Sequence, residues 1–153
     1  RIRAGASSNV LCADTSGDAA SLELAPARMH VVRDPGGALC HTNHFLAPGA
    51  QPSEVALPPS LSSRPRLECA RRHAASRAKL GIAELQALLR DETDGFLSVC
   101  RRPDPSLPEE ARIESVASVI MELARGVMHV APDVPSRVEY RPVALAPEPA
   151  LSA

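Results

Sequence analysis

The order of hydrophobic periodicities along the chain constrains its fold more than any other feature. Period-two and short apolar runs indicate strands at 6–14, 19–25 and 29–32, and an extended segment at 39–46. Spacings of three and four then predict two helices, one over 66–80 that Gly81 would end and one over 82–89. Extended runs return at 96–100, 115–123, 127–130 and 138–145. Strands, then helices, then strands indicate an α+β fold with antiparallel strands and a two-helix insertion.

We therefore expect one domain over 1–145, with strands in 6–46, helices in 62–92 and strands in 96–145. The remaining residues, 146–153, are rich in Pro and Ala, and we expect a flexible tail there. Apolar residues make up 44% of the 153, so the composition is globular, while aromatic residues at 2% leave Ala, Leu and Val to build the core. An isolated half of such a sheet would expose strand edges, which suggests that the chain is part of a larger domain.

Charge and hydropathy argue against two classes of partner. The formal net charge is -1, which gives no electrostatic case for nucleic acid or for a membrane surface, and the Arg-rich stretch from Arg64 to Arg77 is typical of a solvated helix face. The sequence has no apolar run of 18 residues and no signal peptide, so we expect a cytoplasmic protein. The Ala, Arg and Pro bias suggests a bacterial source.

The four cysteines, Cys12, Cys40, Cys69 and Cys100, are widely spaced and contain no C-x-x-C pair. Nothing in the sequence indicates an oxidising compartment, so we interpret them as free thiols. Cys12, Cys40 and Cys100 lie in apolar runs, where a free cysteine acts as a small hydrophobic residue.

The segment His41-Thr42-Asn43-His44-Phe45 carries the clearest chemical signal. It follows Gly36-Gly37 and stands between apolar residues, where an unpaired buried amide costs on the order of 1–3 kcal/mol. An Asn carboxamide offers two N–H donors, so Asn43 is either a structural residue that closes a turn or a donor to a developing oxyanion.

Cys40, His41 and His44 also suggest a metal site. On an extended strand, however, residues 41 and 44 would point to opposite faces, and Cys40 with His44 lacks further ligands at a zinc spacing. We therefore predict no metal and no cofactor, and expect both histidines to hydrogen-bond around Asn43.

The motif resembles the His-Thr-Asn-His segment of the isopenicillin-N (penicillin) acyltransferase family of self-processing N-terminal-nucleophile (Ntn) cysteine hydrolases. The similarity extends to Ala6 to Val10, Leu22-Glu23-Leu24-Ala25-Pro26, Ser63 to Leu67, Ser98-Val99-Cys100-Arg101 and Ser115 to Leu123. The resemblance implies the C-terminal half of an αββα sandwich. It also implies a hydrolase or acyltransferase acting on linear amide bonds through a cysteine that autoproteolysis exposes.

By the same resemblance Asn43 is the oxyanion donor, and Arg101 helps to organise the active site or binds a substrate carboxylate. Ser7, His44 and Phe45 would contact the substrate, a small amide or an acyl thioester. A surface Arg and a plain strand Ser remain equal alternatives for Arg101 and Ser7. The Gly-x-Ser-x-Gly motif of the fungal enzyme is absent, since Ile113-Glu114-Ser115-Val116-Ala117 stands in its place.

The family's self-cleaving Gly-Cys junction is not found in the sequence, and Cys12, which follows Leu11, is a poor candidate for the nucleophile. We therefore expect an N-terminal fragment that carries the nucleophile to be a partner, and the chain alone to be inactive. A homo-oligomer stays open. The alternative is a catalytically inactive remnant that serves as a structural or binding module.

Overall fold

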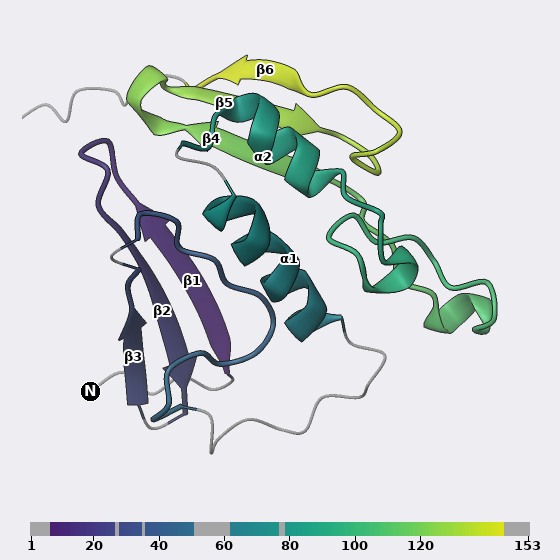
Figure 1. The fold of residues 1–153 in the computed structure, drawn as a ribbon, viewed down its shortest axis with the longest axis horizontal. Coiled ribbons are helices and arrows are strands. Elements are labelled where there is room, and N and C mark those ends of the chain that lie inside the picture. Colours follow the sequence, from purple (N-terminus) through teal and green to yellow (C-terminus); the bar gives the residue numbers. More distant parts are fainter. Residues whose placement is uncertain (1–6, 27, 35, 51–61, 77–78, 146–153) are drawn as a thin grey trace, which may run out of the picture. The chain divides into compact units, whose positions relative to one another are not determined.

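The computed structural model describes residues 7–26, 28–34, 36–50, 62–76 and 79–145 (Figure 1). The chain divides into two compact units, Arg1–Ala78 and Lys79–Ala153, which are treated separately below. In its described part, each unit has one three-stranded antiparallel sheet and one α-helix. The predicted α+β class is confirmed. The expected tail over 146–153 lies outside the described residues.

The sheet of the first unit has the order β1-β2-β3, with β1 Ser8–Ala13, β2 Ala19–Ala25 and β3 Arg28–Val32. All three strands were predicted within a few residues. The turn between β1 and β2 forms because Asp14 Oδ1 accepts hydrogen bonds from the backbone and hydroxyl of Ser16, while Gly17 adopts φ +91.

The two faces of this sheet differ in polarity and burial, and the buried face of β2 is the more polar one. On β2 the buried side chains are Ser21, Glu23 and Ala25, so two of the three are polar. Leu22 points to the opposite face, where its register partners Val10 and Val31 are both exposed. The polar face of the central strand is therefore the covered one.

The segment that follows β3 turns at Asp34 and then covers this polar face. Asp34 accepts hydrogen bonds from the amides of Gly36 and Gly37, and Gly37 has φ +82. The prediction of an extended strand over 39–46 is wrong, because these residues form an irregular loop. Their polar groups bond to side chains of β2 and α1 in place of a neighbouring strand. Residues 36–50 are called the motif loop below.

The helix of the first unit is α1, Ser63–Ala75. Leu67 is buried and Ala70 and Ala74 are half-buried, as the helical spacing predicted. The predicted end at Gly81 is wrong: α1 ends at Ala75, and Gly81 is instead the N-cap of the next helix.

The sheet of the second unit has the order β4-β5-β6, with β4 Ser118–Glu122, β5 Val127–Ala131 and β6 Arg141–Ala144. Leu123–Arg125 forms a short 3-10 turn and Gly126 has φ +61, which reverses the chain between β4 and β5. The helix α2, Ile82–Leu89, packs against β4 and matches the predicted 82–89. Its first turn is capped by the Glu84 carboxylate, which accepts a hydrogen bond from the amide of Gly81.

The predicted strand over 96–100 is wrong. Gly95–Leu97 is a 3-10 turn that begins at a glycine with φ +60, and Ser98 Oγ accepts a hydrogen bond from the amide of Asp94. The amide of Cys100 then donates to Asp91 O, at 2.8 Å. These local bonds use the backbone groups that a strand ladder would need.

Among the helices of the described residues, none combines the length and the apolar character that crossing a membrane requires.

Candidate functional site

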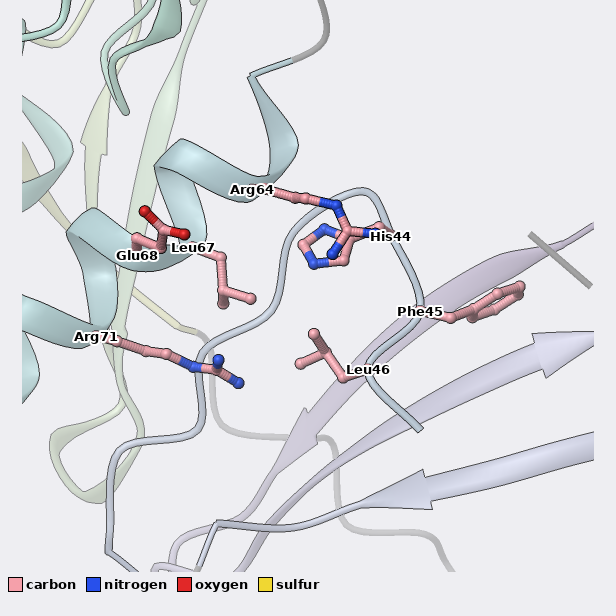
Figure 2. Close-up of a pocket in the computed structure, with 7 residues that line it drawn as sticks. All are labelled: His44, Phe45, Leu46, Arg64, Leu67, Glu68 and Arg71. Atoms are coloured by element: carbon pink, nitrogen blue, oxygen red, sulfur yellow. The ribbon is translucent and has the colours of Figure 1, made fainter. Parts of the chain in front are cut away.

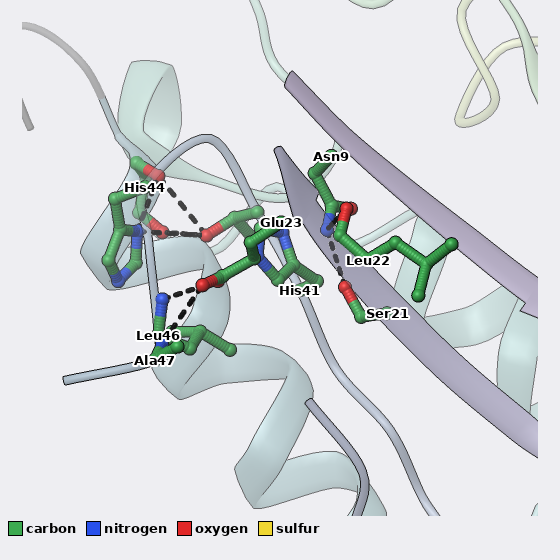
Figure 3. A network of polar contacts seen from close by, with 10 residues as sticks. Asn9, Ser21, Leu22, Glu23, His41, His44, Leu46 and Ala47 are labelled. Atoms are coloured by element: carbon green, nitrogen blue, oxygen red, sulfur yellow. Dashed lines mark hydrogen bonds and ion pairs between the residues drawn. The ribbon is translucent and has the colours of Figure 1, made fainter. Parts of the chain in front are cut away.

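A carboxylate in the middle of the first sheet organises the motif loop. Glu23 lies on the central strand β2 and is fully buried. Its Oε1 accepts hydrogen bonds from His41 Nε2 at 2.8 Å and from the amide of Leu46 at 2.5 Å, and its Oε2 accepts one from the amide of Ala47 at 3.0 Å (Figure 3). One side chain therefore binds the loop on both sides of Asn43.

The electrostatics of Glu23 follow from these bonds. Burial by itself raises the pKa of the carboxyl, but the donors Leu46 N–H, His41 and Ala47 N–H outweigh it and the pKa lies below its ordinary value. Glu23 is therefore ionised at neutral pH. An ionised oxygen only accepts hydrogen bonds, so His41 Nε2 carries the proton that it shares with Glu23.

The N-terminus of α1 holds the loop from another side. Thr42 Oγ1 donates to Ser63 O at 2.9 Å, and His44 Nδ1 lies 2.7 Å from Ser63 Oγ and 3.2 Å from Thr42 Oγ1. His44 and Ser63 are both buried. These bonds tie the loop to the first turn of α1, separately from the bonds to Glu23.

Asn43 is exposed, although the sequence argument treated its amide as a buried group. Its Oδ1 accepts a hydrogen bond of 2.6 Å from Arg66 Nη2, and Arg66 Nε donates to Ser62 Oγ on the preceding turn. A guanidinium has no acceptor, so the atom of Asn43 that faces it must be the oxygen. The two N–H donors of the carboxamide consequently point away from Arg66.

A pocket of about 270 Å³ lies beside the motif, between the loop and α1. Figure 2 shows Leu46 and Leu67 facing each other across it, with Arg64 and Arg71 extending from the helix. Phe45 contributes to the wall but its side chain points away from the pocket. It packs in a buried cluster with Ala25 and Ala50.

The predicted site residues are distributed over both units. Asn43, His44 and Phe45 share the motif loop, and His44 lines the pocket. Ser7 is exposed just before β1. Arg101 is half-buried in the second unit, where its backbone pairs with Ser115 at both N–H and C=O. The roles of Arg101 and Ser7 stay predictions.

The strand argument about His41 and His44 was wrong in its premise, since the segment is not a strand. The two rings nevertheless have different partners, Glu23 for His41 and Ser63 for His44. Within the described residues, Cys40 and His44 belong to no group of three or more metal-ligating side chains. None of the four cysteines forms a disulfide.

Sequence reasoning missed the residues that hold the motif, namely Glu23, Ser63 and Arg66. Each lies inside a segment that carries the family resemblance, and that is the one signal that pointed to them. Hydrophobic alternation does not reveal them, because Glu23 stands between two leucines in the way a solvent-facing residue does.

Comparison with known proteins agrees with the resemblance that the sequence motif carries. A search of curated proteins found no match. The family described as acyl-coenzyme A:6-aminopenicillanic acid acyl-transferase matches residues 1–135, which include the sheet, the motif loop and α1 of the first unit and most of the second. Since this match spans well over half of the sequence, the chain belongs to the acyl-coenzyme A:6-aminopenicillanic acid acyl-transferase family.

Proposed function

We propose that the chain is part of an acyltransferase or amidohydrolase that acts on linear C–N amide bonds through a cysteine thioester. The nucleophilic cysteine is supplied by a segment outside these residues, within an αββα Ntn sandwich whose cysteine is exposed by autoproteolysis. Family membership supports an acyl-transfer or hydrolytic activity in general. The orientation of the Asn43 carboxamide supports its part in the chemistry.

The observation that carries the proposal is the anchored, outward-facing amide of Asn43. Arg66 binds its oxygen, so the N–H groups face away from Arg66 on an exposed residue, whereas the next two residues, His44 and Phe45, are buried. A donor that is held in place before reaction stabilises a developing oxyanion without reorganising, and removal of such a donor typically costs about 10²–10³ in rate.

In the proposed reaction the thiolate attacks the amide carbonyl, and the negative charge that forms on the carbonyl oxygen receives hydrogen bonds from Asn43. Collapse of this intermediate breaks the C–N bond, and the amine leaves with the proton taken from the thiol. The α-amine of the cysteine, with an unperturbed pKa of about 8, acts as the base. Water or an acceptor amine then cleaves the thioester.

The environments of the four cysteines support a nucleophile from elsewhere. Cys69 and Cys100 are buried, and burial raises the pKa of the Cys40 thiol, which disfavours its thiolate. Cys12 is exposed near the end of β1, paired with Ala20. The exposed apolar side chains Val10, Met29 and Val31 on the outer face of the first sheet further support a covering partner segment.

For the substrate we propose a small amide or acyl thioester that enters the pocket beside His44. Leu46 and Leu67 provide an apolar surface, and the charged side chains of Arg64, Glu68 and Arg71 lie beside it. Arg101 and Ser7 are proposed to complete the site on the strength of the family resemblance.

Two substitutions of Asn43 separate catalysis from structure. Asn43→Asp keeps an oxygen for Arg66 and removes both N–H donors, whereas Asn43→Ala removes the whole amide. Measured with the N-terminal segment that carries the cysteine, both variants should lose about 10²–10³ in kcat. The chain alone should give no turnover on amide or penicillin-type substrates.

If Asn43→Asp keeps wild-type activity, Asn43 acts only by binding Arg66 and the donor role is wrong. If the cysteine segment restores no turnover to the wild-type chain, the alternative holds, and the chain is an inactive structural or binding module.

A further inference from the structure

The motif loop depends on a single buried charge. Glu23 is the largest fully buried side chain of the described residues, and the first unit surrounds it with a core that is small and poor in aromatic residues. A buried carboxylate is costly unless donors satisfy it. Its place on β2 is therefore explained by what it binds.

The hydrogen-bond donors to Glu23 lie on both sides of Asn43 in the sequence. His41 begins the five-residue motif, two residues before Asn43, and the amides of Leu46 and Ala47 follow the motif. Backbone amides fix the path of the chain irrespective of side-chain identity. The carboxylate thus determines where the loop passes over the sheet on either side of Asn43.

The backbone at Glu23 is paired with both neighbouring strands. Residue 23 lies in the central strand, paired with Asn9 on β1 and with His30 on β3. Asn9 on β1 also donates a hydrogen bond to Ser21 Oγ on β2 (Figure 3). Ser21 is buried and lies on the same face of β2 as Glu23. Because β2 is hydrogen-bonded to a strand on each side, the position of Glu23 and of the loop that it binds is well defined.

We infer that Glu23 is a positioning residue for acyl transfer: it binds the motif loop on both sides of Asn43 and thereby holds the Asn43 carboxamide where the oxyanion forms. This inference rests on the proposed function. Glu23 itself contacts neither substrate nor nucleophile, and acts through Asn43.

The substitution Glu23→Gln tests the inference because it keeps size and shape. Gln replaces one acceptor oxygen by an NH₂ group, which must then face an N–H donor of His41, Leu46 or Ala47. The loop should shift, and kcat should fall at least about tenfold, up to the loss expected for Asn43→Ala, with KM little changed. Glu122→Gln, in the second unit, is the matched control because Glu122 also lies beside a histidine, His129, and it should leave kcat unchanged.

A double-mutant cycle distinguishes positioning from plain stabilisation. In the Asn43→Ala background, Glu23→Gln should lower kcat no further, because the group through which it acts is already gone. If the two losses multiply, or if Glu23→Gln lowers only the melting temperature, the inference is wrong. Should Glu23→Gln fail to fold, Glu23→Asp and His41→Gln replace it in the same cycle with the same criterion.

The activity of Asn43→Ala distinguishes a failure of the proposed function from a failure of the inference about Glu23. If Asn43→Ala retains full activity, the proposed function fails. The positioning of the loop is then judged by NMR: Glu23→Gln should move the side-chain NH₂ resonances of Asn43 and the amide resonances of Leu46 and Ala47. Unchanged resonances would overturn the inference by themselves.

Discussion

Each unit contains a carboxylate that joins distant segments, and the two differ in how their charge is stabilised. Glu23 in the first unit is fully buried and is bound by two backbone amides and His41. Glu92 in the second unit keeps 20% of its side chain exposed and is bound by the exposed Arg102, by Ser136 Oγ and by Cys100 Sγ.

Both pKa values are lower than usual, for different reasons. For Glu23 burial raises the pKa and the loop amides and His41 outweigh it. For Glu92 the hydrogen bond from Arg102 is the main cause, and the weaker effect of burial opposes it. Water can replace an exposed cation but cannot reach donors that a sheet and a loop enclose. The first carboxylate therefore determines backbone structure, and the second adds a replaceable contact.

The largest expected difference is in stability. Glu23→Ala leaves buried donors unsatisfied, and we expect it to lower the free energy of unfolding of the first unit by about 3 kcal/mol or more. Glu92→Ala should cost much less. Hydrogen exchange of the β2 amides measures the first unit, and fluorescence of Tyr140, the only tyrosine, measures the second. Equal losses in the two variants would contradict the comparison.

The dependence of stability on pH should sharpen the comparison between Glu23 and Glu92. Because the folded pKa of Glu23 lies below the ordinary value of 4.5, its contribution is fully present above that pH and is lost as the pH falls through the folded pKa. Stability of the first unit should therefore decline in acid below about pH 4.5, and Glu23→Gln should flatten that decline. Urea unfolding at several pH values measures the slope. A slope that Glu23→Gln leaves unchanged would show that this carboxyl is not the responsible group.

Salt should give the smallest effect. The Arg102–Glu92 pair is open to solvent, so the stability difference between wild type and Glu92→Gln should shrink in about 1 M NaCl, where the Debye length is about 3 Å. The difference produced by Glu23→Gln should stay nearly constant, because its donors are enclosed. Parallel urea titrations in low and high salt test both expected salt effects. A strong salt effect at Glu23 would mean that water reaches this carboxylate.

Sequence reasoning was most accurate where local chemistry decides the structure. The apolar spacing of Ile82–Leu89 predicts α2 within its observed bounds. It was wrong at 96–100, where Gly95 and the Ser98 hydroxyl favour a 3-10 turn over a strand that the apolar residues alone would form.

The candidate site was predictable in part. The motif and its relation to the family came from the residues themselves, and the family is confirmed. The loop conformation was not predictable, because it depends on contacts between residues 18 to 24 positions apart. Alternation also assigns Glu23 to the solvent face of β2, whereas the motif loop binds this side chain and it is fully buried.

The most direct test of the central claim is an NMR pH titration of the Glu23 carboxyl together with the amide protons of Leu46 and Ala47. The account predicts that all three resonances move with one shared pKa below 4.5, and that the two amides exchange slowly with water at neutral pH. The contradicting result is that the amide resonances of Leu46 and Ala47 do not shift as Glu23 titrates and that these amides exchange as fast as those of an open loop. In that case this carboxylate does not hold the motif, and the explanation of how Asn43 is positioned is wrong.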